Sequence, residues 1–381
     1  MNSSFSPGIQ TLLERHTAWL EGRSIGVLTH RAAVDSRGVT TVERLLKADG
    51  VCVKCLFAPE HGFEGGAAAG EPQKHYTHPD WNIPVYSLYG ESKKPDPEMM
   101  EGLDAVVCDL RDLGTRCYTY VSSLLYMLEA AASASVEFVV ADRPVPLPRV
   151  VDGPVTEEEF RSFVSLADTP FCYGMTPGET ALWYAGTLKP GISLRVAAMR
   201  GYSRNSKLRE DTAQWERPSP GIKSHESALC YPATVFCEAL PSMDYGAGTD
   251  RQFAVFAAPW ADGNRLAEEL SGLGLAGVRF TPCSYASGST GGEVNGVHLE
   301  VTSRSRFRPV GTAVALIYCA QKLYGVERVW QDGNREFFDR LCGTASVRAG
   351  LENGDDPRTT ASLWRKDVMR FKRERRKYLL Y

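Results

Sequence analysis

The chain has 381 residues, of which 43% are hydrophobic and 23% are charged, a composition typical of a globular protein. This length exceeds the roughly 250 to 300 residues at which single cores stop growing, so we expect two domains, residues 1–222 and 223–381. The net charge of -3 gives no field that would attract nucleic acid or an anionic membrane. No apolar segment reaches the ~18 residues of a membrane span, so we expect neither partner.

The location expected from the sequence is the cytoplasm. The first residues, Met1 to Pro7, lack the basic start and the apolar core of a secretion signal. The ten cysteines are scattered along the chain, and reduced thiols fit the cytoplasm. The sequence leaves open whether copies of the chain associate into a homo-oligomer.

The first half alternates short β-rich runs with helical patterns, which is typical of parallel strands joined by crossover helices. Helical spacing is seen at 41–47 and 118–134. The expected strands are 24–29, 51–57, 85–88, 105–110, 137–141 and 194–199. We therefore predict an α/β fold with a doubly wound, mostly parallel sheet.

The second half of the chain has a different composition and a different pattern of apolar residues. A polar stretch at 205–227, rich in Pro and Gly, is interpreted as a boundary or as a long loop over a cleft. The apolar runs that follow are 228–237, 253–260 and 297–301, and the helical patterns are 264–270, 310–324 and one near the C-terminus. We predict a smaller α+β domain.

The segment Phe57-Ala-Pro-Glu-His-Gly-Phe-Glu-Gly65 places Glu60 just beyond the end of an expected buried strand. In open α/β sheets ligands bind at that rim, so Glu60 is the first catalytic candidate. His61 is the second, although its ring could instead hydrogen-bond the adjoining turn. Other polar residues follow strands in the same way and are either functional or ordinary turn formers: His30, Asp109, Asp112, Asp142 and Arg143.

Other motifs are weighed against simpler explanations. His75 and His78 could join His61 as metal ligands, but their spacing is loose and the stretch is loop-like. Tyr118 and Tyr120, at the start of a helix, could stack on a sugar ring or belong to the core. Thr176-Pro-Gly-Glu179 matches a helix capping box, which explains its residue types without chemistry. No glycine-rich nucleotide motif occurs, so nucleotide cofactors are disfavoured.

Taken together, these motifs resemble the exo-β-N-acetylmuramidases of the NamZ type, long described as a domain of unknown function, DUF1343. The resemblance spans nearly the whole chain. The matching pieces include Gly26-Val-Leu-Thr29, Leu56-Phe-Ala-Pro-Glu-His-Gly-Phe63, Gly70-Glu71, Pro84-Val-Tyr-Ser-Leu-Tyr-Gly90, Asp109-Leu-Arg-Asp-Leu-Gly114, Tyr118-Thr-Tyr120, Asp142-Arg-Pro144, Gly174-Met-Thr176, Gly178-Glu179, Ala258-Pro-Trp260 and Tyr378-Leu-Leu-Tyr381.

The resemblance implies a Rossmann-like N-terminal domain and removal of N-acetylmuramic acid from the non-reducing end of peptidoglycan fragments. The family's essential glutamate carries over to Glu60, to which we assign the proton-donor role. The second catalytic group stays open between Asp109, Glu71 and the substrate's own 2-acetamido group. No metal or organic cofactor is needed.

N-acetylmuramic acid carries a 3-O-lactyl carboxylate, so its recognition calls for a cation. Arg143 is the first choice for that cation, and Arg116 is the reserve. The other expected substrate-binding residues are Asp142, Tyr118, Tyr120, Glu71, His30 and Glu179.

Three departures from the family pattern allow other functions. The family usually has Asn where this chain has Val145 and His where it has Tyr173. Its Ser-Glu-Gly-Arg-Gly-Thr segment is altered in Met243-Asp-Tyr-Gly-Ala-Gly-Thr249. These changes are compatible with a shifted substrate preference or with a glycan-binding protein that has lost turnover. A metal-dependent hydrolase built on His61, His75 and His78 is the other alternative.

Overall fold

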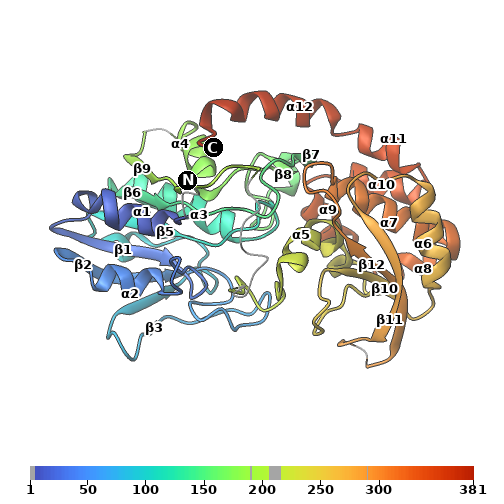
Figure 1. The fold of residues 1–381 in the computed structure, drawn as a ribbon, viewed down its shortest axis with the longest axis horizontal. Coiled ribbons are helices and arrows are strands. Elements are labelled where there is room, and N and C mark those ends of the chain that lie inside the picture. Colours follow the sequence, from blue (N-terminus) through green and yellow to red (C-terminus); the bar gives the residue numbers. More distant parts are fainter. Residues whose placement is uncertain (1–4, 189–190, 206–215, 290) are drawn as a thin grey trace.

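The computed structural model describes residues 5–188, 191–205, 216–289 and 291–381. Within these residues, seven strands form one sheet in the order β3-β4-β2-β1-β5-β6-β9 (Figure 1). All neighbouring pairs are parallel except β3 and β4. The strands are β1 Arg23–Thr29, β2 Val51–Ala58, β3 Tyr76–Thr77, β4 Pro84–Ser87, β5 Ala105–Asp109, β6 Glu137–Ala141 and β9 Leu194–Ala197.

The central strands are apolar except near their ends because both faces of the sheet are covered. Alternate residues of β5 and β6 point into two different cores: Val107 and Val139 pack on one side, and Val106 and Phe138 on the other. Four helices contact the sheet: α1 Gly8–Arg15, α2 Thr41–Leu46, α3 Tyr120–Ala134 and α4 Pro177–Ala185. The predicted capping box of Thr176 and Glu179 starts α4.

The second half is built on a smaller antiparallel sheet of three strands within the described residues, in the order β10-β12-β11. Its strands are β10 Val255–Ala258, β11 Arg279–Ala286 and β12 Glu293–Glu300. The helices around it are α5 His225–Thr234, α6 Gly263–Gly272, α7 Pro309–Tyr324, α8 Val326–Val329, α9 Arg335–Cys342, α10 Ser346–Glu352 and α11 Pro357–Ser362. Short 3₁₀ turns lie at Thr17–Trp19, Pro97–Met100, Glu158–Phe160, η5 Val235–Ala239 and Arg375–Tyr378.

Among the described residues, a hairpin and a long helix help to join the halves. The hairpin β7 Asp152–Val155 and β8 Pro170–Cys172 contacts α7 and α12. Helix α12, Arg365–Glu374, leads the chain back across the molecule, so that the C-terminus lies beside α4 (Figure 1). There Tyr381 donates a hydrogen bond of 2.7 Å to Asp142.

The predicted fold class is confirmed, and each of the six expected strands of the first half is present within two residues of its expected bounds. The apolar run 228–237 belongs to α5 and η5. Residues 206–215 of the polar stretch lie outside the described residues, and the boundary at 222/223 stays a prediction. Among the described helices, none is long and apolar enough to cross a membrane.

Candidate active site

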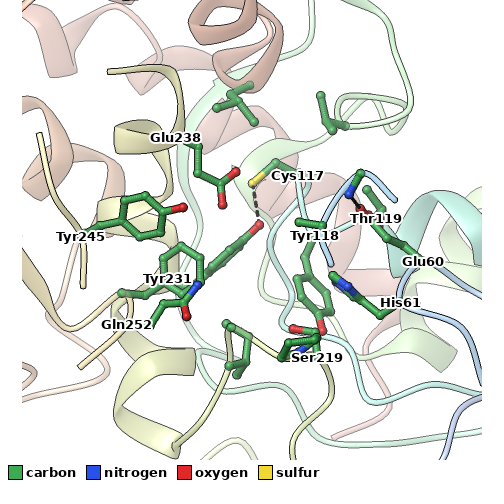
Figure 2. Close-up of a pocket in the computed structure, with 18 of the residues that line it drawn as sticks. Glu60, His61, Cys117, Tyr118, Thr119, Ser219, Tyr231, Glu238, Tyr245 and Gln252 are labelled. Atoms are coloured by element: carbon green, nitrogen blue, oxygen red, sulfur yellow. Dashed lines mark hydrogen bonds between the residues drawn. The ribbon is translucent and has the colours of Figure 1, made fainter. Parts of the chain in front are cut away.

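A cavity of about 590 Å³ lies between the sheet's carboxyl edge and the second half, a volume suited to a small ligand (Figure 2). One wall comes from the loops after β2 and β4 and from the residues that lead into α3. The other comes from α5, η5 and the loops on either side. Its polar and aromatic lining includes Glu60, His61, Tyr89, Tyr118, Thr119, Ser219, Lys223, Tyr231, Glu238, Tyr245 and Gln252.

Glu60 is held on the cavity wall by the loop that follows β2. Pro59 ends the strand, and His61 adopts a left-handed conformation with φ 72°, which its ring supports through a 2.8 Å contact between Nδ1 and the Ala67 carbonyl. The loop then folds back, so that the Gly70 amide donates to Oε1 of Glu60 at 2.8 Å. Thr119 donates to Oε2 at 2.5 Å. An ionised carboxylate is an acceptor only and suits both contacts.

Tyr89 lies beside Glu60 on the same wall. Burial and the negative charge of Glu60 raise the pKa of the Tyr89 phenol to about 12. The phenol therefore remains protonated at neutral pH. It can donate a hydrogen bond within the cavity.

Glu238 approaches the cavity from η5, on the wall opposite Glu60 (Figure 2). Its side chain is accessible to solvent where it faces the cavity, which lies between the two halves. Burial, followed by the charge of Glu60, raises the pKa of the Glu238 carboxyl to about 7. A raised pKa keeps the proton on this carboxyl to a higher pH than usual, so Glu238 can serve as a proton donor.

Aromatic rings line the space between the two glutamates. Tyr118 and Tyr231 meet edge to face with ring centroids 5.7 Å apart, and Phe253 lies 4.8 Å from Tyr231 and 5.1 Å from Tyr245. Flat apolar rings with polar ends provide a surface on which a sugar ring can pack. Of the two tyrosines selected from the sequence, Tyr118 and Tyr120, it is Tyr118 that lines the cavity.

Asp109 and Arg143 do not line the cavity. The Arg143 guanidinium makes a two-pronged ion pair with the Asp109 carboxylate through Nε and Nη2, the latter at 2.9 Å. Thr41 donates to the same carboxylate, and Nη1 of Arg143 donates to the Val34 carbonyl at 2.7 Å. Because these groups bond one another, the geometry supports neither the base role of Asp109 nor substrate binding by Arg143.

Asp142 and Glu179 hold the C-terminus of the chain. Asp142 accepts hydrogen bonds from Thr176, Gly178 and Tyr381, and burial raises the pKa of its carboxyl to about 6. Glu179 pairs with Arg204 and accepts from the Leu380 amide at 2.8 Å. Both side chains are fully buried away from the cavity lining.

The four remaining substrate-binding candidates also lie outside the cavity lining. Arg116 is fully buried and donates to the carbonyls of Pro154, Thr169, Leu341 and Cys342, thereby tying the two halves together. Burial lowers the pKa of His30 well below its usual value, so its ring is neutral. Tyr120 donates to the Pro218 carbonyl at 2.5 Å, and Glu71 is exposed and accepts from the Ala68 amide at 2.9 Å.

The three histidines of the metal alternative are separately engaged. His75 accepts from the Ser87 amide at 2.9 Å, and His78 stacks on Trp81 with centroids 3.9 Å apart. Only His61 of the three lines the cavity. No group of three His, Cys, Asp or Glu side chains suited to a metal ion is found in the described parts of the chain.

The sequence reasoning missed Glu238, Lys223, Thr119 and Tyr89. Glu238 ends an otherwise apolar run, which was a usable signal because a lone acid in such a run is unusual. Thr119 and Tyr89 lie inside segments singled out for their family resemblance. No local signal in the sequence marks Lys223.

Comparison with known proteins decides the family. Residues 25–226 match the N-terminal model of the exo-β-N-acetylmuramidase NamZ, and residues 229–381 match its C-terminal model. The chain belongs to the NamZ family of exo-β-N-acetylmuramidases. These proteins are glycosidases.

Individual relatives agree with this family. The chain is 34% identical over 378 residues to the peptidoglycan β-N-acetylmuramidase NamZ of Bacillus subtilis strain 168, covering 98% of this chain and 91% of the relative. A crystal structure of a DUF1343 family protein from Bacteroides fragilis has a TM-score of 0.91 at 32% identity, with 99% of each chain covered. A second from that organism has a TM-score of 0.79 at 24% identity, covering 100% of this chain and 99% of the other, and shares the fold.

The positions at which the resemblance leads us to expect departures from the NamZ pattern fall in two places. Val145 and Tyr173 are buried outside the cavity lining, and the Tyr173 hydroxyl donates to Asp112 at 2.7 Å. The altered segment 243–249 reaches the cavity through Tyr245 and Gly248. Asp244 holds this segment by accepting from the Gly246 amide and from the hydroxyls of Tyr285 and Ser287, each at 2.6 Å.

Proposed function

We propose that this protein hydrolyses the β-glycosidic bond of a terminal, non-reducing N-acetylmuramic acid in peptidoglycan fragments, with muropeptide pieces as its substrates. One observation carries the proposal: two carboxyl groups in different hydrogen-bonding environments, Glu60 and Glu238, face the same aromatic-lined cavity. Most glycoside hydrolases use such a pair, one group as proton donor and one as carboxylate.

Glu238 is the proton donor in this proposal. It gives its proton to the glycosidic oxygen while the bond from that oxygen to the anomeric carbon breaks. Its raised pKa, about 7, keeps that proton available near neutral pH. The sequence assigned this role to Glu60, but the two donors that contact Glu60 favour the opposite assignment.

Glu60 is the carboxylate partner. Thr119 and the Gly70 amide fix its position, so it can face the positive charge that develops on the sugar ring. A water molecule supplies the hydroxyl of the product. The anomeric configuration of the first product, read by proton NMR, separates general-base catalysis, which inverts it, from attack by Glu60 or by the 2-acetamido group, which both retain it.

The function is tested with a disaccharide of N-acetylmuramic acid linked β-1,4 to N-acetylglucosamine. Wild-type protein should release both sugars, and release should survive exhaustive chelation. Equal background release by wild type and Glu60→Gln would favour the glycan-binding alternative. Activity that chelation abolishes and added metal restores would favour the metal-dependent one.

The cytoplasm and the recycling of cell-wall fragments complete the proposal. All ten cysteines are free thiols in the structure, which fits a reducing compartment. Fractionation of the native cells with an antibody against the protein tests this location.

A further inference from the structure

The cavity has an unusual balance of charge for a site that binds an anionic sugar. Glu60 and Glu238 are both acidic, so an entering carboxylate meets repulsion unless a cation offsets them. The two arginines selected from the sequence cannot serve, because Arg143 is paired with Asp109 and Arg116 is bonded to four backbone carbonyls.

Lys223 is the single lysine or arginine among the described residues that line the cavity. It lies just before Ser224, which caps α5 by accepting from the Ser227 amide at 3.1 Å. Its neighbour Ile222 is buried, so the backbone here is anchored on both sides while the lysine side chain remains partly exposed.

The Lys223 ammonium is available to a ligand. Its contact in the structure is a long hydrogen bond of 3.4 Å from Nζ to the Gly248 carbonyl, and it forms no ion pair with a carboxylate of the described residues. An ammonium has three donor hydrogens, so one weak contact leaves it able to bind an anion. By contrast, Lys94 and Lys322 are paired with Glu129 and Glu269 at 2.7 and 2.6 Å.

We infer that Lys223 recognises the 3-O-lactyl carboxylate of the sugar and sets the preference for N-acetylmuramic acid over N-acetylglucosamine. This inference rests on the proposed function for its substrate class. Lys223 acts in binding and not in bond cleavage, since proton transfer belongs to the glutamates. Gly248, the contact of Lys223, belongs to the segment 243–249, which reaches the cavity.

The test compares 4-nitrophenyl β-N-acetylmuramide with its lactamide, in which the carboxylate becomes a neutral amide. Wild type should prefer the acid. Lys223→Gln should raise KM for the acid by roughly 10- to 100-fold, with kcat nearly unchanged, as expected for loss of a hydrogen bond to a charged group. The variant should treat the lactamide as wild type does, and Lys223→Arg should restore most of the preference.

Lys322→Gln is the matched control, because Lys322 is an exposed lysine that is absent from the cavity lining. It should keep the wild-type preference. If Lys223→Gln also keeps the full preference for the acid, the inference is wrong even though the enzyme is active.

A protein that cleaves neither glycoside would refute the proposed function but would still allow a decision on Lys223. Calorimetric binding of free N-acetylmuramic acid and its lactamide to the same variants then applies. Preference for the acid in wild type and its loss in Lys223→Gln support the inference. Equal affinity of wild type for both sugars overturns it.

Discussion

Two polar clusters lie near the same edge of the sheet, and they differ in how their bonding capacity is used. In the closed cluster, Asp109, Arg143, Asp142 and Glu179 are bonded to one another or to neighbouring donors and acceptors, and all are buried. In the cavity cluster, Glu60, Glu238 and Lys223 face a space that a ligand can enter. A polar residue at the end of a strand is therefore a poor catalytic candidate unless its side chain can still bond a ligand.

The closed cluster occupies the place where a ligand would be expected in a doubly wound sheet. The strand order reverses between β1 and β5, and ligands usually bind outside that point. Here the Asp109–Arg143 pair and the bond from Thr41 fill it. The cavity lies to one side, over the loop after β2, and needs the second half for its other wall.

The largest expected effect is a loss of activity when the cavity cluster is changed. Glu60→Gln should lower kcat/KM by about 10³-fold or more, because the variant lacks the carboxylate that faces the reacting sugar. Its melting temperature should change little. Glu71→Gln, on the same loop but exposed, is the matched control and should keep wild-type activity. A large loss in Glu71→Gln would revive that residue as the catalytic base.

The second expected effect is a loss of stability when the closed cluster is changed. Asp109→Asn leaves the buried Arg143 charge without its partner, and breaking a buried pair typically costs about 3–5 kcal/mol. Denaturant unfolding measures this loss, while the KM of the folded fraction should remain near the wild-type value. Glu300→Gln breaks an exposed pair with Arg279 and should cost under about 1 kcal/mol. Loss of activity in Asp109→Asn at unchanged stability would contradict this division.

The third effect is a pH dependence of activity. A proton donor must be protonated, and the pKa of Glu238 is raised to about 7. The kcat/KM of wild type should therefore fall above that pH, approaching about tenfold per pH unit. Glu238→Gln should lack this alkaline limb, and persistence of the limb in the variant would exclude Glu238 as its source.

The smallest effect is a pH dependence of stability. Burial raises the pKa of Asp112 from 3.8 to about 6, so the folded state holds this proton more tightly than the unfolded state does. The free energy of unfolding should consequently decrease as the pH rises from about 4 to about 6, by about 1–3 kcal/mol from this group. Asp112→Asn should reduce the slope of that part of the curve, while Asp142, whose pKa burial also raises to about 6, still contributes to it. An unchanged slope would place the titration elsewhere.

Much of the fold could be predicted from the sequence because two-sided burial makes parallel strands into continuous apolar runs. The missed elements lack that signal. Strand β11 has several exposed polar residues, and β7 and β8 contain Pro154 and Pro170. Helix α12 is largely charged, so the sequence indicated a helical pattern near the C-terminus but not its bounds.

The candidate site was less predictable for a physical reason. Glu60 could be found because a strand and a proline turn place it locally. Asp109 and Arg143 have the same local signature, but their mutual pairing depends on tertiary structure. Glu238 and Lys223 reach the cavity only because the two halves pack together, which no local pattern encodes.

The most direct test of the account is the dependence of rate on the leaving group. Glu238→Gln should lose about 10²-fold or more in kcat/KM on the natural disaccharide, whose leaving alkoxide needs a proton, and far less on a 2,4-dinitrophenyl glycoside, whose leaving group does not. Glu60→Gln should be impaired on both. Equal losses on both substrates in Glu238→Gln, with selective rescue of Glu60→Gln by the better leaving group, would reverse the two roles.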